Sequence, residues 1–249
     1  MQTISWLAFL SHGALSRSAV HFFPFSGNVS APYATECRLT VFGGGLATRG
    51  VTIEGARLGQ PDGLKIEDAF PEIATVTDGR LVGLQVDLES LQPRVDLSAS
   101  GCYIEVLRNG QGGGGAMRFR PALVDPSGRP RGEFAPLIAC SDRFQTTTLI
   151  VVNRSGESHI PGVAVRPPTA RPWDGGVTPI TIVAPTVPAD SVDEVVLDGN
   201  VWNEATRQEC SWGESVTRAV EIVEPPLGVA YFAVYREPES RRAVSVSAL

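Results

Sequence analysis

Histidine is scarce in this sequence: among 249 residues only His12, His21 and His159 occur. A serine-hydrolase site needs a histidine that is held by a carboxylate and faces a serine, and the G-x-S-x-G motif that presents such a serine is missing. A metal centre built from several histidines is improbable for the same reason. We therefore expect a protein that is not an enzyme, with no catalytic residue and no metal site.

Phosphate-binding loops are also missing. The glycine runs at 43–45 and 112–115 are not followed by Gly-Lys-Ser/Thr, so they are interpreted as loop tips. The acidic clusters around 62–68 and 190–198 lack the D-x-D-x-D-G pattern of a calcium loop and are interpreted as solvated surface. No cofactor is predicted.

Basic residues are few and scattered. The net charge is −6, and Lys65 is the one lysine among 21 basic residues. A nucleic-acid-binding protein usually carries a basic face, so nucleic acid is excluded as a partner. No apolar run reaches the roughly 18 residues that a membrane span needs, so no span is predicted.

Four cysteines are present, and none lies in a C-x-x-C pattern of the zinc or redox type. Cys37 and Cys102 are 65 residues apart, and Cys140 and Cys210 are 70 apart, separations that resemble the inter-sheet spacing of immunoglobulin-type sandwiches. Two disulfides would indicate an oxidising compartment: outside the cytoplasm, at a cell surface or in a virion-like particle. Four buried free thiols in the cytoplasm remain the alternative.

The N-terminal residues 1–22 contain a short apolar segment, Ile4–Leu10. It has no basic stretch before it, and a cut after Ala19 would place Arg17 at the −3 position, where a signal peptidase needs a small residue. We expect a docking arm, with a signal-like segment as the alternative. Its candidate contacts with the domain or with a partner are Trp6, Leu7, Phe9 and Leu10.

What the sequence does contain is β-strand patterning. The hydrophobic content of 43% suffices for ordinary cores, while 19 prolines and 26 glycines suit short strands joined by turns. Alternating or β-branched runs predict strands. They cover 37–42, 51–58, 81–88, 102–107, 116–124, 144–152, 160–165, 177–184, 192–197, 219–223, 229–235 and 243–246. Only single helical turns are expected, near 67–72 and 190–196. The fold class is all-β.

A turn-rich stretch at 125–132 divides this pattern into two halves. We predict two tandem immunoglobulin-like or jelly-roll-type antiparallel β-sandwich domains, covering 23–127 and 128–249. The order of strands and turns is similar in the two halves, which favours a duplication. The cysteines are out of register between the halves: Cys37 lies inside a predicted strand and Cys140 before one.

Trp173, Trp202 and Trp212 fall in predicted loops or strand ends of the second half. Such aromatics either close the ends of a core or contact a partner. We expect a non-catalytic structural or interaction protein, an accessory subunit or a surface or shell component whose partners are other protein subunits, alike or different. A carbohydrate-binding module that uses these tryptophans is the alternative. The N-x-S sequons at Asn28 and Asn153 do not by themselves indicate glycosylation, because such matches often occur by chance.

Overall fold

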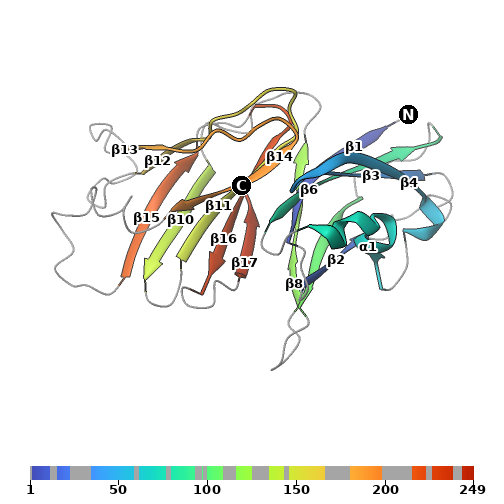
Figure 1. Ribbon diagram of the computed structural model, residues 1–249, viewed down its shortest axis with the longest axis horizontal. Coiled ribbons are helices and arrows are strands. Elements are labelled where there is room, and N and C mark those ends of the chain that lie inside the picture. Colours follow the sequence, from blue (N-terminus) through green and yellow to red (C-terminus); the bar gives the residue numbers. More distant parts are fainter. Residues whose placement is uncertain are drawn as a thin grey trace. The chain divides into compact units, whose positions relative to one another are not determined.

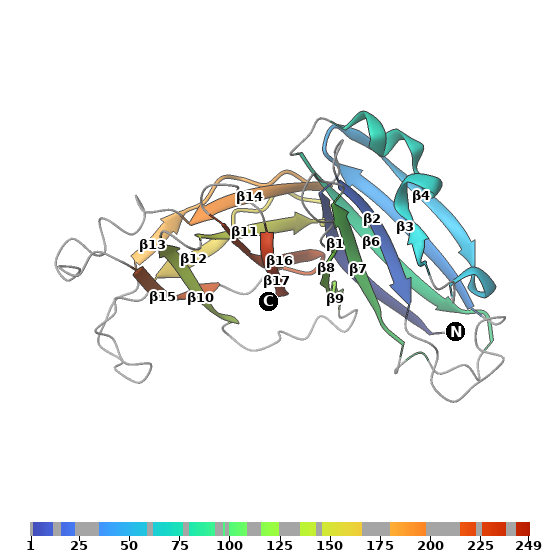
Figure 2. The same cartoon turned by 90° about the horizontal axis from the view of Figure 1, so that it is seen from below.

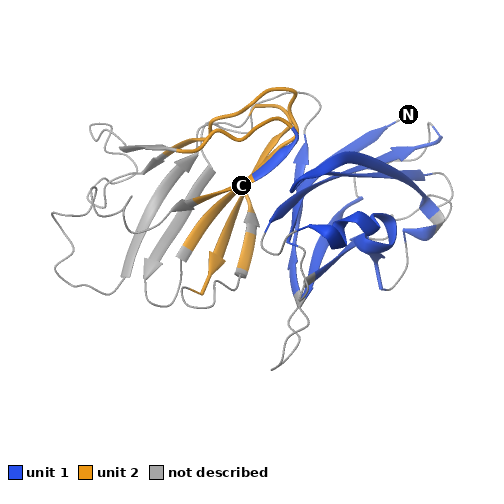
Figure 3. Cartoon of the chain, viewed as in Figure 1, with its two compact units in different colours: residues 1–126, 190–192 blue, residues 127–189, 193–249 orange. Residues whose placement is uncertain are grey.

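A computed structural model provides the structure of this chain. It describes residues 2–11, 16–22, 35–58, 62–76, 80–92, 97, 100–108, 116–124, 135–142, 146–165, 180–197, 215–222, 226–237 and 243–249. The chain separates into two compact units (Figure 3). Unit 1 comprises Met1–Pro126 and Asp190–Val192, and unit 2 comprises Ser127–Ala189 and Asp193–Leu249. The division falls inside the turn-rich stretch at 125–132.

Unit 1 consists of two antiparallel sheets (Figure 1). Sheet A has the strand order β4-β3-β6-β1-β9, and its strands are β1 (Thr3–Ser11), β3 (Thr35–Gly43), β4 (Leu46–Glu54), β6 (Leu81–Ser90) and β9 (Ala122–Val124). Sheet B has the order β5-β2-β7-β8, and its strands are β2 (Ser16–Phe22), β5 (Leu64–Lys65), β7 (Cys102–Arg108) and β8 (Ala116–Phe119). A short helix, α1 (Ile66–Ala69), follows β5.

The core of unit 1 follows from period-two alternation along the strands. In β3, Cys37, Leu39 and Val41 share one face, and each is fully buried. In sheet B, Ile104 and Val106 share the buried face of β7. The two sheets form the layers visible in Figure 2. The helix α1 and the 3-10 turn Pro71–Thr75 add Ile66, Phe70 and Ile73 to the buried set.

Unit 2 is built on one eight-stranded antiparallel sheet, sheet C, with the order β13-β12-β15-β10-β11-β16-β17 and with β14 paired to β11. Its strands are β10 (Ala135–Asp142), β11 (Thr146–Asn153), β12 (Gly162–Val165), β13 (Ile180–Val183), β14 (Ser191–Leu197), β15 (Ser215–Ile222), β16 (Val229–Arg236) and β17 (Ala243–Ala248). Tyr231 on β16 packs in a buried cluster with Leu149 and Val151 of β11 and Val195 of β14.

The all-β prediction is confirmed: the described residues form three antiparallel sheets and a single four-residue α-helix. Helix α1 overlaps the single helical turn expected near 67–72. The alternative of a helical turn near 190–196 is wrong, because β14 covers that segment. Cys140 lies inside β10 rather than before a strand. None of the described helices is long or apolar enough to cross a membrane.

The prediction that residues 1–22 form a segment separate from the first domain is wrong, although their apolar side chains do pack within the chain. Residues 1–22 contribute two strands to unit 1: β1 lies between β6 and β9, and β2 lies between β5 and β7. Trp6, Leu7, Phe9 and Leu10 are all buried, with exposures between 0% and 6%. Because β1 is buried on both faces, it reads as a continuous apolar run without alternation. That run resembles a docking segment when only the sequence is considered.

Candidate interaction surface

Sheet B has one apolar face and one polar face. Ile104, Val106 and Val20 lie on the apolar, buried face. The residues between them point to the other side, and the strand register brings them together. His21 of β2 is opposite Tyr103 of β7, and Glu105 of β7 is opposite both Ala19 of β2 and Arg118 of β8. A row of chemically active side chains therefore crosses the polar face.

The carboxylate of Glu105 is the centre of this row. Its Oε1 accepts a hydrogen bond from Arg118 Nε at 2.6 Å, and its Oε2 lies 2.9 Å from His21 Nε2. Glu105 and His21 are buried, whereas the side chain of Arg118 is 62% exposed. Buried polar groups are therefore paired with each other, and together they hold a cation at the surface.

The ring of His21 is fixed by packing as well. It stacks on Tyr103 with ring centroids 4.6 Å apart and an interplanar angle of 5°. A Cβ atom at Gly63 would lie 2.8–2.9 Å from three atoms of the His21 ring, so the close contact requires glycine, which also has a φ of +67°. The Arg118 guanidinium lies 5.5 Å from the centroid of the same Tyr103 ring. The arrangement is preorganised: His21 and Arg118 share both a carboxylate and an aromatic ring.

Electrostatics keep Glu105 ionised. Burial by itself would raise the pKa of Glu105, but hydrogen bonds from Arg118 and His21, together with their charges, outweigh it and hold the pKa below its usual value. The same ion pair raises the pKa of Arg118. The carboxylate is therefore a fixed negative partner rather than a proton carrier near neutral pH.

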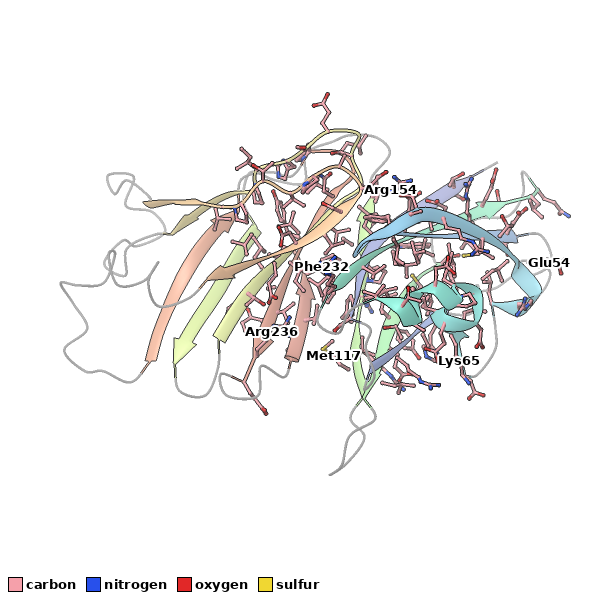
Figure 4. All side chains as sticks on the ribbon, in the orientation of Figure 1. Glu54, Lys65, Met117, Arg154, Phe232 and Arg236 are labelled. Atoms are coloured by element: carbon pink, nitrogen blue, oxygen red, sulfur yellow. The ribbon has the colours of Figure 1, made fainter. Side chains whose placement is uncertain are left out.

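Around this network the polar face of sheet B exposes basic and apolar side chains. Arg17 is 62% exposed and bonds Glu67 Oε1 at 3.1 Å, and Leu107, directly opposite Arg17, is 40% exposed. Lys65 (labelled in Figure 4) lies on β5, in register with Ala19. We call this surface the β2–β7–β8 face, which consists of Arg17, Leu107, Arg118, Tyr103 and Lys65. It combines arginine, tyrosine and leucine on a rigid sheet.

The Glu105 pairing leads to a pH prediction. A carboxylate with a depressed folded pKa stabilises the fold above its unfolded pKa, about 4.3, and this contribution disappears as the pH falls through the folded value. We expect Glu105→Gln to lower the urea midpoint of unfolding at pH 7. The gap between wild type and variant should be smaller at pH 3 than at pH 7, because the contribution declines once the pH is below about 4.3. A gap of the same size at both pH values would contradict the assignment.

Unit 2 has a separate polar cluster at the end of β11. The Asn153 side chain is fully buried, and its Nδ2 donates to the carbonyl oxygens of Glu157, Val187 and Pro188 at 2.9–3.0 Å. Its Oδ1 accepts from the Ser155 backbone N–H and hydroxyl. Both ends of the amide are used inside the fold, so the sequon at Asn153 offers no accessible acceptor for a glycan in the folded state.

His159 closes the same end of unit 2. Its Nε2 lies 2.6 Å from the Tyr231 hydroxyl, and its backbone pairs with Val187. Burial lowers the pKa of His159 and raises that of Tyr231, so both side chains are neutral near pH 7. A neutral histidine paired with a neutral tyrosine stabilises this part of the sheet.

The seven residues that the sequence predicted as partner contacts fall into two groups in the structure. Trp6, Leu7, Phe9 and Leu10 offer no contact surface, because they are buried within the chain. Trp173, Trp202 and Trp212 lie outside the described residues. The carbohydrate hypothesis, which depends on these three tryptophans, stays a prediction.

Of the four candidate disulfide cysteines, the structure describes the side chains of two. Cys37 and Cys102 are free, buried thiols, on β3 of sheet A and β7 of sheet B. Burial raises the pKa of each thiol well above its ordinary range. The two sulfur atoms are not bonded to each other in this structure. Cys210 and the side chain of Cys140 lie outside the described residues, so their pairing stays a prediction.

Within the part of the chain that the structure describes, no three His, Cys, Asp or Glu side chains are grouped so that they could hold a metal ion. Comparison with known proteins gives no further guide to function. No family model matches the sequence, and no curated protein is significantly similar to it.

The β2–β7–β8 face is not apparent from the sequence. His21 and Glu105 are 84 residues apart, and only the pairing of β2 with β7 joins them. One local signal existed: in Cys102–Leu107, Tyr103 and Glu105 alternate with apolar residues. An acidic residue next to an aromatic one on the solvent side of a strand indicates a polar face that needs a basic partner.

Proposed function

We propose that this chain is a non-catalytic interaction protein made of immunoglobulin-like β-sandwich modules, which serves as an accessory subunit or surface component of a larger assembly. The observation that carries the proposal is the β2–β7–β8 face. There Arg17, Leu107 and Arg118 are exposed above a buried network that fixes their surroundings.

The composition of this face fits a protein partner. Tyrosine and arginine are enriched at the energetic centres of protein interfaces, and a preorganised side chain loses less entropy when it binds. Arg118 is held by Glu105 and lies against Tyr103, so its position is set before any partner arrives. Leu107 supplies an apolar contact between the two arginines.

Exposed hydrogen-bond donors indicate the chemistry of the partner. Arg17 and Arg118 lie on β2 and β8, with β7 between them. Arg17 is opposite Leu107 and Arg118 is opposite Glu105, so two strand spacings and a two-residue offset separate them by about 12 Å. Glu67 and Glu105 compensate the two charges, so the surface offers guanidinium N–H donors beside the exposed Leu107 rather than a net positive charge. Carboxylate oxygens next to an apolar side chain would complement these donors. We expect an acidic protein surface.

The two histidines that the structure describes, His21 and His159, support a role without catalysis. The His21 ring is committed to Glu105, Tyr103 and Gly63, and His159 is committed to Tyr231. A general base must instead be within hydrogen-bond reach of a proton on the substrate. In both cases the observed contacts are those of a structural side chain.

Site-specific photocrosslinking tests the proposal. A photoreactive residue in place of Leu107, in the full chain made in its source cells, should give an adduct with one defined protein. Because the arginines contribute to affinity, Arg17→Gln and Arg118→Gln should each reduce the adduct about tenfold, equal to about 1.4 kcal/mol of binding free energy. The adduct is identified and quantified by mass spectrometry.

A matched control uses the same photoreactive residue in place of Glu157, which is exposed in unit 2. That position should give no adduct with the same protein. Equal crosslinking from both positions, or adducts that are insensitive to both arginine variants, would show that the β2–β7–β8 face is not a docking surface.

A further inference from the structure

Strand β4 forms one edge of sheet A (Figures 1 and 2). It is nine residues long, and among the described residues it pairs only with β3. The exposed residues of this strand include Ala47, Thr48, Gly50 and Thr52. A long edge strand has a row of unpaired N–H and C=O groups that can pair with another chain.

The other edges of unit 1 are protected by their shortness. Among the described strands, β9 has three residues, β5 has two and β8 has four. A short edge strand offers few backbone N–H and C=O groups to a second strand, which is one way in which natural sheets avoid association. Strand β4 lacks this protection, and its sequence contains no proline or lysine.

The one cation on this edge is already neutralised. Arg49 Nη1 donates to both carboxylate oxygens of Glu72, at 3.1 and 3.2 Å. A charge in the middle of an edge strand normally opposes pairing with a like strand, because identical charges meet at the centre. Here Glu72 of the same chain compensates for that charge.

We propose that β4 pairs antiparallel with β4 of a second copy of this chain, so that the two copies of sheet A form one continuous sheet across a two-fold axis. A two-fold axis between antiparallel strands requires a strand that is complementary to itself. The register in which all nine residues of both strands overlap is centred on Gly50, the midpoint of Leu46–Glu54.

The side-chain pairs in this register are compatible. Thr48 lies opposite Thr52 of the second copy, a hydroxyl pair that is favourable across strands. Ala47 lies opposite Ile53, and Arg49 lies opposite Val51. No two like charges face each other, and glycine at the axis leaves room for the closest approach. Each pair occurs twice, which favours a second copy over an unrelated extended segment.

Charge-pair variants of the exposed threonines test this register. In Thr48→Glu/Thr52→Glu, glutamates of the two copies face each other, whereas in Thr48→Lys/Thr52→Glu a lysine faces a glutamate. Sedimentation velocity on the full chain, from about 1 to 100 µM, should show a concentration-dependent dimer for wild type. We expect the glutamate pair to weaken the dimer at least about tenfold and the lysine–glutamate pair to keep it.

Circular dichroism checks that both variants fold, since Thr48 and Thr52 are exposed in the single chain. A wild-type chain that stays monomeric at every concentration overturns the proposal, as does a glutamate-pair variant that dimerises as tightly as wild type. Equal loss in both variants overturns the register centred on Gly50. None of these results depends on the β2–β7–β8 face, so a negative result for one proposal leaves the other unaffected.

Discussion

Replacing Gly83 with alanine is expected to destabilise unit 1 by about 3 kcal/mol, at the upper end of the usual cost of overpacking. Gly83 lies in β6, directly opposite Phe42 of β3 on one side and Phe9 of β1 on the other. A Cβ atom at this position would lie 2.3 Å from two atoms of the Phe42 ring. Phe42 is fully buried, so its ring cannot swing into solvent to make room.

The measurement is the free energy of unfolding in urea. Gly156→Ala is the matched control, because a Cβ atom there meets nothing within 4 Å. That substitution should change stability by less than about 0.5 kcal/mol or raise it slightly, since alanine restricts the unfolded chain.

A double-mutant cycle identifies the cause. Phe42→Leu removes the ring that the new methyl group strikes, so combining it with Gly83→Ala should cost less than the sum of the two single changes. We expect a coupling of at least about 1 kcal/mol, within the range measured for residues in contact. Additive effects would show that the glycine is needed for another reason.

The second large effect is expected at Asn153, where Asn153→Asp should destabilise unit 2 by about 3–5 kcal/mol, the usual cost of a buried charge without a partner. Asparagine donates from Nδ2 to three carbonyl oxygens. Aspartate has nearly the same shape but donates nothing when ionised, so its negative oxygen would face three partial negative charges.

The pH dependence distinguishes this cause from a packing defect. Burial raises the pKa of an aspartate above its unfolded value of about 3.9, so the penalty is full at high pH and falls as the pH drops below the folded pKa. The difference in urea midpoint between wild type and Asn153→Asp should therefore be smaller at pH 4 than at pH 8.

Ser158→Asp provides the matched control. It adds the same charge to an exposed position in the same loop and should change stability by less than about 0.5 kcal/mol. A similar loss in Ser158→Asp would point to the net charge of the loop rather than to the Asn153 hydrogen bonds.

The sequence predicted the strands whose two faces have different surroundings. Leu84, Val86 and Leu88 alternate with polar residues in β6, and this period of two is sufficient to identify a strand. A period of two could not identify β1, because Trp6–Leu10 is buried on both faces of the sheet and shows no alternation of polar and apolar residues. For such a run, strand and docking segment have the same local pattern.

The candidate surface was less accessible to prediction than the fold. The network of His21, Glu105 and Arg118 joins three strands, and the strand register decides which residues of those strands are neighbours. Register depends on the packing of complete sheets and on the turns between strands. Two strands joined by the glycine run at 110–115 are expected to form a hairpin, but nothing in the sequence alone determines the register that places Glu105 opposite Arg118.

The position of β1 in sheet A also means that this strand is synthesised well before the strands with which it pairs. This strand leaves the ribosome before its neighbours in sheet A, which are β6, ending at Ser90, and β9, ending at Val124. At about 5–20 residues per second, β9 follows β1 by roughly 6–24 s. Through that interval the apolar run Trp6–Leu10 has no completed sheet to enter, so we expect chaperones to bind it on the nascent chain.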